Sequence, residues 1–362
     1  MNPGEGDTRQ GMISWEAARR VAAGVTSRRQ LGAPDRAELR DDFAELVPLA
    51  ESLVTEQCGL RPAAGPAHAV VVDRSEWIAA NTHSFERLLT PLLARLPSSP
   101  AAGLPGYGAV ARVGKAVTGA EMGALLGWMA GRVLGQYDVI LGAVEDGVSG
   151  DVLFVGPNIV DIERRYGFPR RQFRLWIALH ELTHRAQFTG VEWMRRHFMS
   201  LIEEAFGSSM PAAGQILDGL RKAVQATRSR RNPIDSGIGL LGLFMDDAQR
   251  EVFFRVQGLM SLLEGHGDVV MDRAGADRIP LAGHFSRVLA DRRKSMSGVG
   301  KLVMQMVGLD AKMRQYAEGE RFVHEVETRG GRELFDRVWE RPENLPDSSE
   351  IREPDRWVAR VG

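Results

Sequence analysis

The spacing of apolar residues predicts that most of the chain is helical. From Trp15 to about Gly59, apolar side chains recur at intervals of three and four residues, as they do on the buried face of a helix. These side chains are Ala17, Val21, Phe43, Leu46, Leu49 and Leu53. The same periodicity predicts further helices over about 75–96, 169–188, 191–206 and 240–272, and from there to about Trp339.

Two short runs of β-branched and apolar residues are the strand candidates. Residues His68–Asp73 have the sequence HAVVVD, and residues Asp151–Val155 have the sequence DVLFV before a Gly-Pro pair. The Pro- and Gly-rich segment 97–106 is typical of a loop. Many helices with two or three short strands predict a mainly α fold of the α+β type.

Five glycines recur at every fourth position from Gly119 to Gly135 and predict a smooth stripe along one side of a helix. Such a stripe is typical of helices that pair inside a membrane. Here Glu121, Arg132 and Gln136 interrupt the stripe, and its apolar stretch is too short to span a bilayer. The favoured interpretation is a helix of a soluble protein that packs closely against a neighbour.

The order of these segments predicts one large domain between two tails. Residues 1–11 are predicted to be a flexible tail, residues 12–340 a single domain, and residues 341–362 an extended C-terminal tail interrupted by prolines. The helices before residue 150 could form a subdomain over 12–150. A chain of 362 residues is also long enough for two domains.

Composition narrows the choice of partners and compartment. The chain has 46 Lys and Arg against 47 Asp and Glu, so no basic face is implied and nucleic acid is not expected as a partner. The single cysteine, Cys58, excludes an intrachain disulfide and fits a reducing compartment. The polar N-terminus lacks the apolar run of a signal peptide, and no segment reaches the roughly 18 apolar residues of a membrane span. We therefore expect a cytoplasmic protein without a membrane partner, and the sequence leaves the oligomeric state open.

The segment WIALHELTHRAQF contains the residues with the clearest chemistry. His180 and His184 are four residues apart, so on a helix both imidazoles lie on one face and can bind one ion. Glu181 directly follows His180 and so lies beside it on the helix, where it can contact a water on that ion without being a ligand. This HExxH pattern is typical of zinc sites in which the metal acidifies a water and a carboxylate takes its proton. The alternative is a pair of core histidines held by hydrogen bonds.

A catalytic zinc usually has three protein ligands and a water, and no third His follows HELTH at the metzincin spacing. Glu264 is the favoured third ligand, because it follows an apolar helical run in which an unpaired carboxylate is costly. Asp268 lies four residues later and could accept the remaining N–H of a ligand histidine. His266 and Asp268 are the alternative ligands. The segment could also be an ordinary helix end with a Gly stop.

Other residues are weaker candidates. His266 and Tyr316 could stabilise an oxyanion, although the sequence alone places neither of them. The strand predicted at 151–155 precedes the HELTH helix and could align an extended substrate by strand addition, or it could be paired for purely structural reasons. Among the remaining histidines, we expect His197, His284 and His324 at the surface or in packing roles. His68 and His83 belong to no motif.

HELTH with the downstream LLEGHGD resembles the gluzincin branch of zinc peptidases, where a Glu ligand is followed four residues later by an Asp that supports the site. More closely, nearly the whole chain resembles the type 2 zincin-like metallopeptidases, an uncharacterised family often labelled as hydrolases or as associated with biosynthesis of the deazaflavin coenzyme factor 420. The similar stretches are DDFAELVPLAESLV, VVDRSEWIAAN, LFVGPNIV, ALHELTHRAQFTGVEW, SLLEGHGDVVMD, LDAKMRQYAEGERFV and WERPENLPDSSEIREPDRWVARV. The resemblance implies a zincin-like core with an HExxH helix, a second ligand helix and a few short strands. It does not imply that the coenzyme binds, because no flavin or dinucleotide loop is present.

Together these observations predict a zinc-dependent hydrolase, and specifically a metallopeptidase that acts on a peptide or small amide. His180, His184 and Glu264 would bind one zinc per chain, Glu181 would be the general base, and Asp268 would orient a histidine. One alternative is a non-catalytic protein with a structural zinc and a partner-binding surface, but a structural site needs no base such as Glu181. The other is a non-peptide amidohydrolase of cofactor metabolism, which the family label favours weakly.

Overall fold

The structure of the chain is a computed structural model that describes residues 13–26, 30–63, 65–94, 107–137, 151–207, 247–294 and 309–362. The chain divides into two compact units, of which the first comprises residues 1–52 and 64–182 and the second comprises residues 53–63 and 183–362. The tail predicted at 1–11 and the loop predicted at 97–106 lie outside the described residues. One domain over 12–340, with a subdomain over 12–150, stays a prediction.

The first unit is mainly helical and contains a small sheet. Its helices are α1 (Trp15–Val25), α2 (Ala33–Cys58), α3 (Arg74–Ala94), α4 (Tyr107–Ala130), α6 (Gly156–Tyr166) and α7 (Arg170–Gly190), and its strands are β1 (His68–Val72), β2 (Gly135–Tyr137) and β3 (Asp151–Val155). The last residues of α2 and of α7 belong to the second unit. The predicted α+β fold is confirmed. Within the described ranges, no helix combines the length and the apolar character needed to cross a bilayer.

The sheet has the strand order β1–β3–β2. Strand β1 pairs with β3 in parallel, from His68 opposite Asp151 onward, and β2 pairs with the other edge of β3 in antiparallel fashion. Both predicted strands are therefore confirmed, whereas the sequence analysis missed β2. Because β3 is paired on both edges, the prediction that it aligns a substrate by strand addition is wrong.

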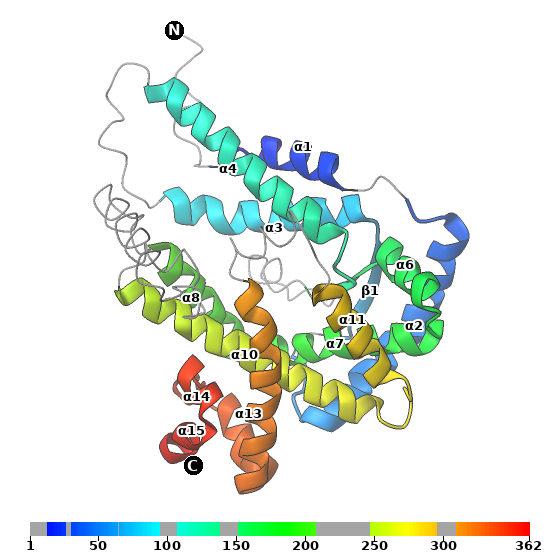
Figure 1. The fold of residues 1–362 in the computed structure, drawn as a ribbon, viewed down its shortest axis with the longest axis vertical. Coiled ribbons are helices and arrows are strands. Elements are labelled where there is room, and N and C mark those ends of the chain that lie inside the picture. Colours follow the sequence, from blue (N-terminus) through cyan, green and yellow to red (C-terminus); the bar gives the residue numbers. More distant parts are fainter. Residues whose placement is uncertain are drawn as a thin grey trace. The chain divides into compact units, whose positions relative to one another are not determined.

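The glycine stripe packs α4 closely against α1, and Figure 1 shows these two helices side by side. The facing pairs are Gly119 with Ser14, Gly123 with Ala18 and Gly127 with Ala22, where a Cβ added to the glycine would lie 2.2, 2.2 and 2.7 Å from the facing carbonyl oxygen. Cβ atoms essentially never come within 3.0 Å of such an atom, so only glycine permits this approach. The predicted close pairing is confirmed for these three positions, while Gly131 follows the end of α4 and Gly135 lies in β2.

A buried ion cluster fixes the first turns of α7 to its neighbours in the first unit. Arg174 on α7 is fully buried and donates to both carboxylate oxygens of Glu163 on α6, at 2.8 and 2.9 Å. Its Nη1 also donates to Glu38 and Asp42 on α2, at 3.1 and 2.6 Å. Burial opposes the charged form, but these hydrogen bonds and the charge of Glu163 raise the pKa of Arg174 above its ordinary value. The start of α7 is thus held by charged groups from two other helices.

The second unit is built around two long helices that cross, α10 and α13 (Figure 1). Its elements, besides the ends of α2 and α7, are α8 (Met194–Gly207), α10 (Asp247–Gly275), α11 (Ala282–Lys294), α13 (Leu309–Asp336), η4 (Arg337–Trp339), η5 (Pro342–Asn344), α14 (Ser348–Arg352) and α15 (Pro354–Val361). At the crossing, a Cβ added to Gly265 of α10 would lie 2.1 Å from the carbonyl carbon of Gly319 of α13. Gly265 is an internal residue of α10, so the alternative of a helix end with a Gly stop is wrong.

The predicted extended tail at 341–362 is wrong, because this segment contains η5, α14 and α15. Asp347 starts α14 with a capping box: its Oδ1 accepts from the N–H groups of Ser349 and Glu350, and a Glu350 carboxylate oxygen accepts from the N–H of Asp347. Prolines that look like interruptions in the sequence lie in first turns, where a missing N–H does no harm. Trp357 of α15 is fully buried, so the segment is part of the core.

Candidate metal centre

Three predicted ligands converge in the structure. One ligand atom from each of His180, His184 and Glu264 lies within 4.8 Å of the other two. His180 and His184 lie one turn apart on α7, and Glu264 comes from α10. All three are partly buried. Two imidazoles and one carboxylate are a ligand set of catalytic zinc, so the chemistry of these donors fits the metal that the sequence predicts.

The contact between His184 and Glu264 brings α10 to α7 in the second unit. His184 Nε2 lies 3.8 Å from Glu264 Oε2, and both side chains are less than one-fifth exposed. The two atoms are too far apart for a hydrogen bond. His184 Nε2 and Glu264 Oε2 are the atoms that these two residues would offer to a metal ion. The role of these residues as ligands stays a prediction.

Glu181 lies against the backbone of β2 in the first unit. Its Oε2 accepts a hydrogen bond from the N–H of Tyr137, at 3.2 Å, and a Cβ added to Gly135 would come within 2.6–2.8 Å of the Glu181 side chain. Val155 N–H donates to the carbonyl of Leu134, at 2.8 Å, so in this antiparallel ladder Gly135 and Tyr137 direct their backbone groups away from β3. The outer edge of β2 therefore faces Glu181, and Gly135 leaves room for the carboxylate.

The structure also identifies a residue that the sequence analysis missed. Gln187 is fully buried on α7, three residues after His184, and its side-chain oxygen lies 2.9 Å from His184 Nδ1. Its side-chain nitrogen lies 2.8 Å from the carbonyl oxygen of Leu263 and 2.9 Å from His266 Nδ1. The spacing of three residues after His184 was the signal available in the sequence, because it puts Gln187 on the same helical face.

His266 contacts the side-chain nitrogen of Gln187 and is not one of the three converging residues. Its ring is 4% exposed and packs on Phe335 and Trp339, with centroid distances of 5.5 and 5.0 Å. Burial, together with the positive charge of Arg332, lowers the pKa of His266 to about 3, so the ring is neutral at physiological pH. A role for His266 in stabilising an oxyanion stays a prediction, and the structure gives its Nδ1 the Gln187 amide as a partner.

The other predicted residues are placed as follows. Asp268 is partly buried on α10, one turn after Glu264, and its role in orienting a histidine stays a prediction. Tyr316 belongs to α13, but its side chain lies outside the described residues. His197 is partly buried against Trp193. The exposed histidines, none of which joins the converging residues, are His68, His83, His284 and His324.

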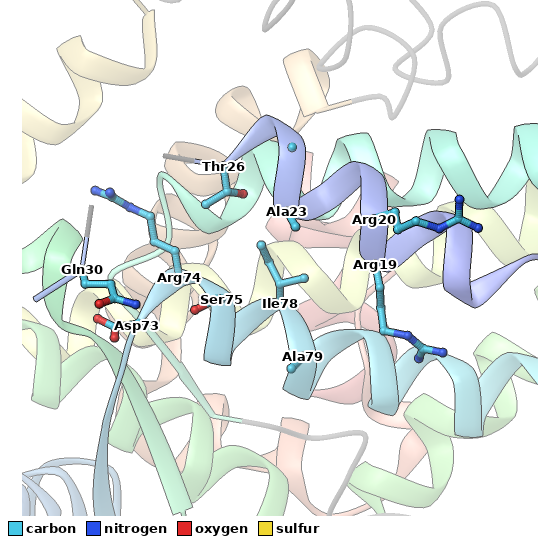
Figure 2. A pocket seen from close by; sticks show the side chains of 11 residues that line it. Arg19, Arg20, Ala23, Thr26, Gln30, Asp73, Arg74, Ser75, Ile78 and Ala79 are labelled. Atoms are coloured by element: carbon cyan, nitrogen blue, oxygen red, sulfur yellow. The ribbon is translucent and has the colours of Figure 1, made fainter. Parts of the chain in front are cut away.

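A separate hollow of about 520 Å³ lies over α1 and the start of α3 in the first unit (Figure 2). Its arginines already have acidic partners: Arg74 pairs with Asp161 at 2.8 Å, and Arg19 pairs with Glu86 at 3.1 Å. None of the three converging residues lines it. The charges in this hollow are explained by structural pairing.

The chain is similar to one known protein family and to one solved structure. The model of the zincin-like metallopeptidase family matches residues 13–358. The chain is also similar to a solved structure from Chloroflexus aurantiacus, described as "a putative hydrolase with a novel fold". The two sequences are 32% identical, the similarity covers 96% of this chain and 98% of that chain, and the TM-score is 0.70. None of the curated proteins matches the chain.

Proposed function

Because the chain belongs to the zincin-like metallopeptidase family, we propose that it is a zinc-dependent hydrolase that cleaves a peptide or small amide. His180, His184 and Glu264 bind the metal, and Glu181 is the general base. The observation that carries the proposal is the convergence of one ligand atom from each of these three residues within 4.8 Å.

In this proposal each residue has a separate task. His180, His184 and Glu264 would hold the zinc, which would supply an acidified water and polarise the scissile carbonyl. Glu181 takes the proton of the attacking water and passes it to the leaving amine. The N–H of Tyr137 donates a hydrogen bond to one carboxylate oxygen of Glu181. Gly135 has no Cβ, which leaves room for the Glu181 side chain beside β2. The base is therefore held in one orientation before a substrate arrives.

An extended peptide is the substrate that the described sheet favours. Among the described strands, β2 lies at the edge of the sheet, and Gly135 directs its backbone groups to the same outer side as the Tyr137 N–H, which already binds Glu181. A peptide that pairs with the Gly135 groups of this edge would have its backbone beside the base. This feature favours a peptidase over a non-peptide amidohydrolase, for which a closed pocket would be expected. Glu181 itself argues against a purely structural zinc.

Metal analysis tests the ligand set. Purified protein should contain about one zinc per chain, and His184→Ala should lose most of it, because a three-ligand site is left with two. Glu264→Ala should weaken zinc binding far more than Asp268→Ala, since loss of a supporting residue usually costs about 10- to 100-fold in affinity. Full zinc occupancy in His184→Ala would contradict the proposed site. If Asp268→Ala abolished binding while Glu264→Ala retained it, the two roles would be reversed.

A second experiment separates catalysis from metal binding. Glu181→Gln keeps the shape of the side chain but removes the base, so zinc content should stay unchanged while hydrolysis falls by roughly 10²- to 10⁴-fold. Digestion of a peptide library of mixed sequence, followed by mass spectrometry, measures cleavage of many candidate substrates at once. Glu192→Gln, a change at an exposed carboxylate, is the matched control and should cleave like the wild type. A cleavage activity that survives Glu181→Gln would show that Glu181 has another role.

A further inference from the structure

The amide of Gln187 connects the two helices that carry the proposed ligands. Gln187 lies on α7, three residues after His184, and both of its partners on α10 lie close to Glu264 in sequence. Leu263 directly precedes Glu264, and His266 follows it by two residues. Gln187 is 0% exposed, so its polar atoms cannot be satisfied by bulk water and each of these contacts matters energetically.

The donors and acceptors around Gln187 can be assigned from its contact with a backbone carbonyl. The carbonyl oxygen of Leu263 can only accept, so the Gln187 atom at 2.8 Å from it must be the amide nitrogen. That nitrogen has a second hydrogen, and His266 Nδ1 at 2.9 Å is its acceptor. The opposite assignment would place two carbonyl oxygens against each other. The orientation of the buried amide is thereby fixed.

This orientation determines the tautomer of His184. The Gln187 oxygen lies 2.9 Å from His184 Nδ1 and can only accept, so Nδ1 must carry the hydrogen. In the neutral ring the lone pair is then on Nε2, the nitrogen that lies 3.8 Å from Glu264 Oε2. A metal ligand has to offer such a lone pair, and a hydrogen bond from the opposite ring nitrogen both fixes its direction and increases its basicity.

We propose that Gln187 is a positioning residue that holds His184 in the Nδ1–H tautomer with Nε2 directed at the metal, and that His266 anchors Gln187 from behind. The expected effect on zinc binding rests on the proposed function, whereas the hydrogen bonds of Gln187 do not depend on it. The aromatic packing of His266 on Phe335 and Trp339 keeps its acceptor nitrogen in place. The support of His184 therefore comes from an amide on its own helix, whereas the sequence predicts this role for Asp268.

The first test measures the tautomer directly in zinc-free protein. Long-range ¹⁵N NMR at neutral pH distinguishes Nδ1–H from Nε2–H imidazoles, and the His184 signals are identified by their loss in His184→Ala. The wild type should show the Nδ1–H form, and Gln187→Met, which keeps the volume but removes the amide, should lose this preference. A wild-type His184 in the Nε2–H form would overturn the proposal, and this result does not depend on whether zinc binds.

The second test measures zinc affinity by competition with a chromophoric chelator. Gln187→Met should bind zinc about 10- to 100-fold more weakly than the wild type. Gln187→Glu keeps an acceptor for His184 Nδ1 and should recover part of the loss. Thr189→Val is the matched control, because it removes a buried hydroxyl of α7 that donates only to the Arg185 carbonyl, at 2.7 Å. It should bind zinc within twofold of the wild type.

The outcomes separate the two proposals. If Gln187→Met binds zinc within twofold of the wild type while His184→Ala does not bind, the zinc site stands and the positioning role fails. If the wild type itself does not bind zinc, the proposed function fails and the NMR experiment still decides the tautomer. A variant that does not fold leaves the wild-type tautomer as the deciding measurement.

Discussion

The crossing of α10 and α13 permits a sharp prediction about the helix that carries Glu264. A Cβ added to Gly265 would lie 2.1 Å from the carbonyl carbon of Gly319 and 2.3 Å from the nitrogen of Glu320. Both are backbone atoms and cannot rotate away. To reach an ordinary contact of 3.4 Å, the helices must separate locally by at least 1.3 Å. A gap of 0.5–1 Å already removes a quarter to a half of the dispersion energy of the contacts across an interface.

Gly265→Ala should therefore destabilise the second unit. Overpacking of this kind usually costs about 1–3 kcal/mol, and the shift required here puts it at the upper end. The change also removes the entropic cost of a glycine inside a helix, a gain of about 0.5–1 kcal/mol. The net loss is about 2 kcal/mol, or roughly 4–8 °C in melting temperature for a unit of this size. Because Glu264 precedes Gly265, zinc affinity should fall as well.

Gly267→Ala is a control on the same helix, two residues away. Its added Cβ would lie 3.7 Å from His184 Cε1, which is an ordinary contact. This variant should gain the same 0.5–1 kcal/mol without a clash, and its melting temperature should equal or exceed that of the wild type. Calorimetry of the three zinc-free proteins measures the difference. Equal melting temperatures for Gly265→Ala and Gly267→Ala would refute the argument that the crossing requires glycine.

Three further predictions follow from other parts of the chain. Gly123→Ala should lower the melting temperature, because its Cβ would lie 2.2 Å from a carbonyl oxygen of α1, whereas Gly114→Ala has nothing within 4 Å and should raise it slightly. Asp347→Ala should cost about 0.5–2 kcal/mol in urea unfolding at pH 7, because α14 loses its cap. Burial opposes the charged form of Asp347, but hydrogen bonds from Ser349 and from backbone N–H groups lower its pKa in the folded protein. The stabilisation by ionised Asp347 is therefore complete above the ordinary pKa of 3.8 and is lost as the pH falls through the lower pKa of the folded protein. A difference in stability between the wild type and Asp347→Ala that persisted unchanged in strong acid would contradict the role of Asp347 as a charged cap. Burial raises the pKa of the Cys58 thiol, so a thiol reagent at pH 8 should react much faster with urea-unfolded than with native protein, and equal rates would exclude a buried thiol.

Local patterns allowed part of the site to be predicted from the sequence. His180, Glu181 and His184 lie within five residues of one helix, so their spacing alone places them on neighbouring positions. The prediction of Glu264 rests on the cost of a carboxylate in an apolar helical run, and the structure brings Glu264 to the two histidines. Gln187 was missed because its partners Leu263 and His266 are 76 and 79 residues away, and periodicity carries no information about such pairs.

The errors in the fold also have physical causes. Strand β2 has three residues, too few to show an alternating pattern, and its position is defined only by pairing with β3. The sequence predicts an extended tail at the C-terminal helices because prolines usually interrupt helices. Here Pro342 and Pro354 begin short helices instead, and the capping box at Asp347 begins a third. The glycine stripe was interpreted correctly as a close helix contact, but the sequence could not identify α1 as the partner.

The burial of Trp357 has a consequence for the order of events during synthesis of the chain. Trp357 packs edge-on against Phe322, with ring centroids 5.6 Å apart, so it belongs to the core of the second unit. It follows Leu182, the last residue of the first unit, by 175 residues. At about 5–20 residues per second, the ribosome needs roughly 9–35 s to cover that distance. The first unit thus has time to fold while the core of the second is still incomplete. Phe322 precedes Trp357 by 35 residues, so a nascent chain would expose the apolar surface around Phe322 to chaperones for roughly 2–7 s of that interval.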